Sequence, residues 1–435
     1  MEISELYQIF SQHPTITTDT RDCTPGSLFF ALKGTSFNGN AFAQQALDSG
    51  CAYAVVDDPS VVSDERMLLV DDVLHTMQDL AAYHRRQLGL PVLQITGTNG
   101  KTTTKELVAA VLAKKYNVLY TQGNFNNHIG VPKTLLRLTA EHEFAVIETG
   151  ANHPGEIAEL SRIVQANCGL ITNVGMAHLE GFGSFEGVVQ TKGELYADLK
   201  QRAGSFIFLH ADNPHLTRIA EGLHAVTYGQ PEKGYDVEGE VLAATPFLAI
   251  RWRKPGCEWH EVQMQLIGTY NVDNALAAVA VGLHFGVAPE KIDAALAHYK
   301  PTNNRSEWVK TDRNDLIVDA YNANPTSMKA ALDNFHTIQH AHKMVILGEM
   351  RELGAASVEA HQHIVDQLLA MPELAADKVW LVGESFRPFA STFRHFPSVE
   401  EVKQELQAHP VSERLVLIKG SNGTRLFQLM KEQVL

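Results

Sequence analysis

A glycine-rich stretch that contains one lysine is the first feature of this sequence whose residue types could do chemistry. It follows the short apolar run 92–96 and consists of Gly97, Thr98, Asn99, Gly100, Lys101, Thr102 and Thr103. Glycines let the backbone curl around phosphates, the start of the next helix offers unpaired N–H groups, and a lysine adds positive charge. We therefore predict a nucleotide phosphate loop in which Thr102 ligates Mg²⁺. Ile95 stands where the usual loop has glycine, so the match is to a shortened version, and the alternative is a glycine-rich turn with an exposed lysine.

Two more candidate side chains stand where other apolar runs end. Glu148 closes the run 144–148, and His178 follows the run 170–173. The carboxyl ends of parallel strands form the rim at which nucleotide-binding sheets hold their ligands. A carboxylate there could complete a Mg²⁺ shell that phosphates begin. Alternatively Glu148 caps the next helix and His178 is structural, but three candidates at one rim support one another.

Aromatic and amide side chains further along could recognise a base. Tyr270, Asn271 and Asn274 open an alanine-rich helical stretch. Amide donors and acceptors beside an aromatic face suit an adenine ring, although asparagines at a helix start are most often caps. In the last third Arg305 stands out, and Asp319 ends an apolar run where it could accept hydrogen bonds from ribose hydroxyls. The Asn-Ala-Asn-Pro stretch that follows could be a simple turn.

The candidate residues can meet in one site only if the strands that carry them end at the same edge of a sheet. The order of apolar and amphipathic segments along the chain predicts such strands. Short apolar runs alternate with helix-length amphipathic stretches, which is typical of α/β folds with mainly parallel sheets. The stretch 234–265 alternates with period two and is expected to be antiparallel, whereas 300–304 looks like a linker. We predict three α/β domains with helices at 76–88 and 271–284 and strands at 28–32, 54–56, 67–70, 92–96, 144–148, 170–173, 206–209, 316–319, 344–348, 379–383 and 415–419.

The amino-acid composition and net charge exclude several classes of protein. A chain of 435 residues with 45% hydrophobic and 20% charged residues is expected to fold as several globular domains. Its formal net charge of −14 argues against broad binding to nucleic acid or to an anionic membrane. The 4 cysteines are widely spaced, so we expect reduced thiols in a cytoplasmic protein rather than a zinc site or a disulfide framework. The acidic N-terminal residues lack the basic region of a signal peptide, and no apolar run is long enough for membrane insertion. We also expect the protein to be a monomer.

The motifs, in this order and over nearly the whole chain, resemble the Mur ligase family. The resemblance implies an ATP-dependent amide ligase with ATP and Mg²⁺ as cofactors. It implies that Lys192 corresponds to a lysine that many members carry as a carbamate and that helps to bind the metal. Catalytic and metal-binding roles would fall on Lys101, Thr102, Glu148, His178 and Lys192, and nucleotide contacts on the loop 97–103 together with Tyr270, Asn271, Asn274, Arg305 and Asp319.

The stretches 124–132, 319–327 and 347–354 resemble the members that attach D-alanyl-D-alanine to a UDP-N-acetylmuramoyl tripeptide. These would then be the substrates, in the synthesis of a peptidoglycan precursor. The stretches 19–21 and 25–34 resemble the loop that receives the UDP end, and substrate contacts would fall on Thr20, Arg21, Asn126, Asn127, Tyr321 and Asn324. The implied architecture has an N-terminal UDP-substrate domain (1–88), a central ATP domain with a mainly parallel sheet (89–300), and a Rossmann-like C-terminal domain (301–435) that binds the dipeptide and part of the ATP.

Two other functions remain open at this point. One is another amide ligase on the same fold, such as a folylpolyglutamate synthetase or a different muramoyl ligase. The other is a nucleoside triphosphatase that acts as a switch or a binding module. ATP turnover separates the classes, because a ligase needs both the nucleotide sugar and the amine acceptor.

Overall fold

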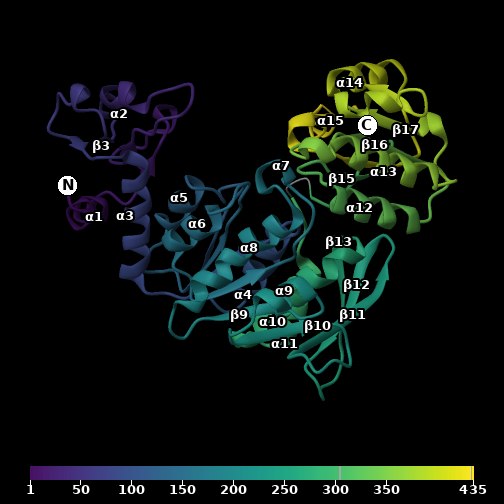
Figure 1. The fold of residues 1–435 in the computed structure, drawn as a ribbon, viewed down its shortest axis with the longest axis horizontal. Helices are drawn as coiled ribbons and strands as arrows, with labels where there is room; N and C mark the ends of the chain where they lie inside the picture. Colours follow the sequence, from purple (N-terminus) through teal and green to yellow (C-terminus); the bar gives the residue numbers. More distant parts are fainter. Residues whose placement is uncertain (303–304, 433) are drawn as a thin grey trace.

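Three β-sheets, one after another along the chain, organise the protein in the computed structural model (Figure 1). The structure describes residues 1–302, 305–432 and 434–435, so Asn303 and Asn304 of the predicted linker lie outside the described residues. Figure 1 shows the three sheets in separate lobes, with the N-terminal and C-terminal lobes at opposite ends of the molecule. Among the helices that the structure describes, none combines the length and the apolar character that crossing a lipid bilayer requires.

The N-terminal domain is a small parallel sheet with the strand order β1-β2-β3-β4. Asp72 caps the long helix α3 by accepting a hydrogen bond from the His75 backbone, and Gly89 in the left-handed conformation ends it. This helix packs against α5 and α6 of the next domain, so the two domains share one apolar core. The elements are α1 (Ile3–Gln12), β1 (Ile16–Thr17), β2 (Leu28–Phe30), α2 (Ala43–Asp48), β3 (Tyr53–Val56), β4 (Met67–Leu69) and α3 (Val73–Leu88).

The central domain has a sheet of 9 strands in the order β13-β12-β11-β10-β9-β8-β5-β7-β6. Strands β5 to β11 pair in parallel, and β11, β12 and β13 form the antiparallel part that the period-two pattern predicted. The strands are β5 (Val92–Thr96), β6 (Val118–Tyr120), β7 (Phe144–Glu148), β8 (Cys168–Ile171), β9 (Phe206–His210), β10 (Ala225–Gly229), β11 (Val237–Ala244), β12 (Phe247–Arg253) and β13 (His260–Ile267).

Both faces of the parallel part of this sheet are buried, which explains the continuous apolar runs. Successive residues of β7 alternate between the two cores: Phe144 and Val146 pack towards α4, α10 and α11, and Ala145 and Ile147 pack towards α5, α6 and α8. The helices are α4 (Lys101–Leu112), α5 (Gly130–Leu135), α6 (Glu156–Val164), α7 (Leu179–Phe182), α8 (Phe185–Lys200), α9 (Pro214–Ile219), α10 (Val272–His284) and α11 (Pro289–His298).

The C-terminal domain has a sheet of 6 strands in the order β14-β15-β19-β16-β17-β18, in which only β14 is antiparallel to its neighbour. Helices α12 and α13 cover one face, and α14 and α15 cover the other. The elements are β14 (Glu307–Lys310), β15 (Asp315–Asp319), α12 (Pro325–Thr337), β16 (Lys343–Gly348), α13 (Ser357–Leu369), β17 (Val379–Val382), β18 (Arg394–Phe396), α14 (Val399–Ala408), β19 (Leu415–Lys419) and α15 (Gln428–Lys431).

Candidate active site

The predicted phosphate loop joins strand β5 to the start of α4, as the sequence indicated. Gly97 and Gly100 have positive φ angles of 140° and 76°. A Cβ atom on Gly97 would lie 2.1 Å from the Thr172 hydroxyl, and one on Gly100 would lie 2.6 Å from the Asn274 side chain. Both glycines are therefore required by backbone conformation and by space.

The loop is held open by hydrogen bonds from the carboxyl end of the neighbouring strand β8. The backbone N–H groups of Thr98 and Asn99 donate to the backbone oxygen and the side-chain oxygen of Asn173, each at 2.9 Å. Thr172 and Asn173 donate in return to the Asn99 carbonyl, at 2.6 and 3.0 Å. The loop conformation is thus fixed before any ligand binds.

Lys101 lies at the first position of α4 and lines a cavity that extends to the C-terminal domain. Its Nζ donates to the carbonyls of Gly97 and Thr98 at 2.8 and 3.1 Å. Burial lowers the pKa of Lys101 to about 8, against the opposing effect of the Glu148 carboxylate. Thr103 lines the same cavity, whereas Thr102 is only 3% exposed and is not among the lining side chains, so its role as a metal ligand stays a prediction.

Glu148 ends β7 and is 1% exposed. Its Oε1 accepts a hydrogen bond of 2.8 Å from Asn126 Nδ2, and its backbone N–H donates to the Thr121 hydroxyl at 2.9 Å. Its Oε2 is buried with no hydrogen-bond partner among the described residues. A buried carboxylate oxygen without a partner is costly, and its position on the cavity wall fits a divalent cation.

His178 lies at the start of α7, with a positive φ of 51°. It lines the same cavity as Glu148 and Lys101, so the sheet rim brings the three predicted side chains together. Its Nδ1 is hydrogen-bonded to Glu352 of the C-terminal domain. Burial lowers the pKa of His178 below its ordinary value, and the Glu352 carboxylate opposes that shift.

Lys192 lies in the middle of α8 and is 2% exposed. Its Nζ donates to the Ala151 carbonyl at 3.2 Å and lies 5.1 Å from the centre of the Phe182 ring. Burial, followed by the charge of Lys101, lowers the pKa of Lys192 to about 7. Glu194 does not pair with this lysine, because it accepts hydrogen bonds from backbone N–H groups at the start of α6. Its small exposed fraction also shows that Lys192 does not lie on the solvent-facing side of α8.

A cavity of about 660 Å³ extends from the phosphate loop to the C-terminal domain. Tyr270, Asn271 and Asn274 line it beside the loop. The asparagine side chains are not helix caps: Asn271 donates to the Ile267 carbonyl, and Asn274 donates to Asn271 and accepts from Thr104, at 2.8 to 3.0 Å. These bonds fix α10 against α4 and hold the amide groups at the cavity wall.

The C-terminal domain contributes the opposite wall of this cavity. Arg305 lies 3.8 Å from the centre of the Tyr321 ring, and both side chains line the cavity. Asp319, at the end of β15, is paired with Lys419 at the end of β19. Asn324 caps α12 and donates a hydrogen bond of 2.7 Å to the side-chain oxygen of Asn99 in the phosphate loop. Asn324, predicted as a substrate contact, thus joins the two domains in this structure.

The other predicted substrate residues fall into two places. Asn126 and Asn127 line the cavity, where Asn126 holds Glu148 and Asn127 accepts hydrogen bonds from the first N–H groups of α5. Thr20 and Arg21 lie in the N-terminal domain, outside the cavity lining. Arg21 is exposed, and its guanidinium donates two parallel hydrogen bonds to the carboxylate of Asp19, with which it forms an ion pair.

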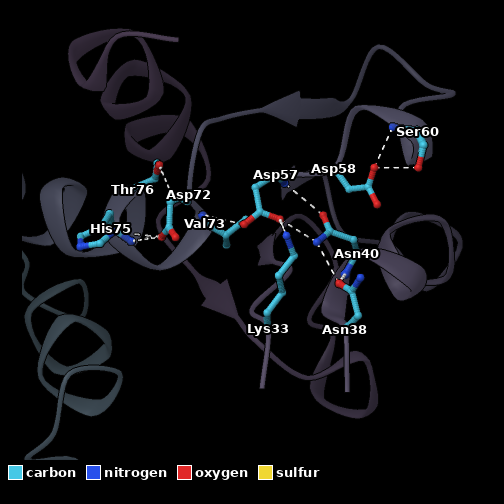
Figure 2. Close-up of polar contacts among 10 residues, drawn as sticks. All are labelled: Lys33, Asn38, Asn40, Asp57, Asp58, Ser60, Asp72, Val73, His75 and Thr76. Atoms are coloured by element: carbon cyan, nitrogen blue, oxygen red, sulfur yellow. Dashed lines mark hydrogen bonds and ion pairs between the residues drawn. The ribbon is translucent and has the colours of Figure 1, made fainter. Parts of the chain in front are cut away.

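A second polar cluster lies in the N-terminal domain around the buried carboxylate of Asp57, just after β3. Figure 2 shows Lys33, Asn40 and the backbone N–H of Val73 converging on it, at 2.9, 2.7 and 3.3 Å. Burial opposes ionisation, but these hydrogen bonds outweigh it and hold the pKa of Asp57 below its ordinary value. Asp57 therefore fastens both ends of the loop 33–40, next to the stretch predicted to receive the UDP end.

Glu352 and Lys419 were not among the predicted site residues, although each contacts one of them. Lys419 is the last residue of the apolar run 415–419. A charged residue at the end of a predicted strand is the signal that could have identified it as a site residue. Glu352 belongs to the stretch 347–354. The resemblance of that stretch indicated the identity of the substrates, but it indicated no role for the Glu352 side chain itself.

The described residues contain no group of three or more His, Cys, Asp or Glu side chains that could hold a metal ion unaided. A weakly held hard cation fits this donor set, because Mg²⁺ commonly takes one or two protein carboxylates and completes its shell with substrate phosphates and water. Glu148, with its unpartnered oxygen, is the clearest donor.

Three Mur ligase family models match this chain. The model for the catalytic domain matches residues 14–92, the middle-domain model matches 95–282, and the glutamate ligase domain model matches 304–422. The chain is 34% identical to the UDP-N-acetylmuramoyl-tripeptide–D-alanyl-D-alanine ligase of Bacillus subtilis, over 96% of this chain and 93% of that protein. Among solved structures, MurF from Acinetobacter baumannii is 32% identical, with a TM-score of 0.86 over 99% of this chain and 98% of that one. MurF from Thermotoga maritima, solved in complex with ADP, shares the fold with a TM-score of 0.85, at 23% identity over 97% of each chain.

Proposed function

Because the chain belongs to the Mur ligase family, we propose that it is an ATP-dependent ligase that joins D-alanyl-D-alanine to a UDP-N-acetylmuramoyl tripeptide, a step of peptidoglycan synthesis. The named relatives support this substrate pair, since they align with the chain nearly from end to end. A cytoplasmic location, a monomeric state and domain boundaries after residues 88 and 300 belong to the same proposal.

The observation that carries the proposal is the single cavity in which the phosphate loop, Glu148, His178 and Arg305 meet. A carboxylate is a poor acyl donor, so the tripeptide carboxylate must first be activated. In the proposed reaction this carboxylate attacks the γ-phosphorus of ATP, ADP leaves, and an acyl phosphate forms. The D-alanyl-D-alanine amine then attacks the acyl carbon, and phosphate leaves with the formation of the amide bond.

The residues of the chain would act mainly through charge and position. Lys101 and the loop N–H groups stabilise the charge that develops on the transferring phosphoryl group. Arg305, held against Tyr321, adds a positive charge from the other side of the cavity. Lys101 exchanges its hydrogen bonds to the Gly97 and Thr98 carbonyls for phosphate oxygens. Holding the reactants between two domains removes much of the entropic barrier to their encounter.

Mg²⁺, when bound, would neutralise charge on the β- and γ-phosphates. Glu148 would hold it through Oε2, and His178 and a carbamate on Lys192 are the further ligands that we propose. The pKa of Lys192 is about 7, and this low value favours the formation of a carbamate, because only the neutral amine of lysine reacts with CO₂.

The test is phosphate release from ATP with every combination of the two substrates, followed by mass spectrometry of the nucleotide product. We expect turnover only when UDP-N-acetylmuramoyl tripeptide and D-alanyl-D-alanine are both present, with one amide formed per ATP. Turnover that ignores the nucleotide sugar would favour a nucleotide switch, and turnover with folate and glutamate would favour the folate ligase alternative.

A further inference from the structure

The contact between His178 and Glu352 joins the central domain to the C-terminal domain beside the predicted metal site. His178 Nδ1 and Glu352 Oε2 are hydrogen-bonded, and the Glu180 backbone N–H reaches the Glu352 carbonyl at 3.4 Å. Both partners of the side-chain contact have left-handed backbones, with φ of 51° at His178 and 62° at Glu352. Left-handed backbone is uncommon outside glycine, and it occurs most often at active sites, ligand clamps and switch regions.

Glu352 is carried by a segment that is firmly attached to its own domain. Met350 and Leu353, on either side of it, are buried in the core formed with α12 and α13. The Met350 backbone N–H donates to His361 Nε2 at 3.0 Å, and the Arg351 backbone N–H donates to the Ser421 hydroxyl at 3.2 Å. The carboxylate therefore moves with the whole C-terminal domain.

His178 is oriented equally firmly from its own side. Its ring packs edge-on against Phe182, with ring centres 6.1 Å apart and planes at 89°. Nδ1 is engaged by Glu352, and Nε2 makes no hydrogen bond within the described part of the chain. A carboxylate at Nδ1 fixes the proton on that nitrogen and leaves the lone pair of Nε2 free.

We infer that Glu352 is a positioning residue which, when the C-terminal domain is docked, sets the tautomer and the direction of His178 so that Nε2 faces the metal site. The inference rests on the proposed function, in which His178 serves the Mg²⁺ that accompanies ATP. Because the two residues belong to different domains, metal binding and domain docking become linked, and each favours the other.

A purely structural role for this contact is the competing explanation. The Glu352 side chain is 53% exposed, and ion pairs that are this exposed contribute little to stability. Other contacts join the same two domains, including Asn99 with Asn324 and Tyr270 with Ser306. Removing the Glu352 carboxylate should therefore leave the melting temperature and the docking of the domains nearly unchanged.

The experiment measures Mn²⁺ binding to the full-length enzyme in the presence of ADP by electron paramagnetic resonance, with Mn²⁺ as the probe of the Mg²⁺ site. Glu352→Ala should weaken Mn²⁺ binding about tenfold, the usual size of effect when the partner of a metal-bound histidine is lost. Glu352→Gln, which keeps a hydrogen-bond acceptor, should recover part of the loss. Glu359→Ala, an exposed glutamate on the neighbouring helix α13, is the matched control and should bind as the wild type does.

The His178→Ala background separates a contact through His178 from a general effect of charge. There, Glu352→Ala should cause no further loss, because the residue that it positions is gone. The inference is overturned if Glu352→Ala binds Mn²⁺ like the wild type, or if it weakens binding equally in the His178→Ala background. Failure of the proposed function would be recognised separately, as a wild-type enzyme that binds Mn²⁺ and ADP but does not ligate.

Discussion

Raising the pH through neutrality in the presence of CO₂ should convert Lys192 to its carbamate. The pKa of this buried lysine is lowered from 10.5 to about 7. At pH 7 about half of the side chain is therefore neutral, against roughly one part in 3,000 for a lysine of ordinary pKa. The gain in reactive amine is about a thousandfold, and it arises because the site is closed to water and lies near the charge of Lys101.

The same shift predicts how stability depends on pH. Lowering the pKa of Lys192 from 10.5 to about 7 corresponds to about 5 kcal/mol by which the folded state disfavours the lysine ammonium. This penalty is present in full below pH 7. It falls as the pH rises towards 10.5, because the folded lysine has lost its proton while the unfolded one still holds it. Without CO₂, Lys192→Met should therefore unfold at a higher temperature than the wild type at pH 6, and the difference should shrink at pH 9.

The assay for the carbamate is ¹³C nuclear magnetic resonance of the protein in ¹³C-labelled bicarbonate between pH 6 and pH 8. A carbamate signal should grow as the pH passes about 7, and Lys192→Met should lack it. Lys200→Met, which removes an exposed lysine of the same helix, is the control and should keep it. Lys192→Ala should lose activity and regain part of it with short carboxylic acids. A signal that survives in Lys192→Met, or full activity of Lys192→Ala, would refute the reasoning.

Four further outcomes follow from the structure. Lys101→Ala should lower kcat about 10²–10³-fold and leave the melting temperature unchanged or raised, because the charge acts on the transition state and its burial disfavours the folded protein; a large fall in melting temperature would contradict this role. Glu148→Ala should raise the Mg²⁺ concentration for half-maximal rate about tenfold, and an unchanged Mg²⁺ dependence would make Glu148 structural. Asp57→Asn weakens the hydrogen bonds by which the Asp57 carboxylate holds the loop 33–40. The substitution should therefore raise KM for the UDP substrate about tenfold and leave KM for ATP unchanged. Equal changes in both KM values would show that its effect is not confined to the N-terminal domain. Nucleotide should stabilise the docked arrangement, in which Lys101 and Arg305 line one cavity, so small-angle scattering should give a smaller radius of gyration with an ATP analogue and substrate; identical profiles would mean that the domains are docked without ligand.

Much of the fold could be predicted because its strands are buried on both faces and therefore appear as apolar runs. Strands β5, β7, β9, β15, β16 and β19 lie within a residue or two of the predicted ranges, and the period-two stretch is the antiparallel part of the central sheet. Strands β6, β14 and β18 were not predicted, because an edge strand of 3 or 4 residues gives too short a pattern. Helix α3 begins at Val73, three residues before the predicted start, where Asp72 caps it.

The candidate site was predictable to the extent that it depends on strand ends. Lys101, Glu148 and His178 meet because parallel strands end at one rim, and this follows from the sequence pattern. Contacts between domains do not follow from any local pattern. The hydrogen bond between Asn99 and Asn324, and the one between His178 and Glu352, depend on how two separately folded domains dock.

The most direct test of the central claim is to follow oxygen from the tripeptide to phosphate. UDP-N-acetylmuramoyl tripeptide labelled with ¹⁸O in its terminal carboxylate is incubated with the enzyme, ATP, Mg²⁺ and D-alanyl-D-alanine. If the carboxylate attacks the γ-phosphorus and the amine then displaces phosphate, one ¹⁸O atom must appear in each phosphate released, and the other must remain in the new amide. Phosphate that carries no ¹⁸O would mean that water attacks ATP directly, which would contradict the account of this protein as a ligase that works through an acyl phosphate.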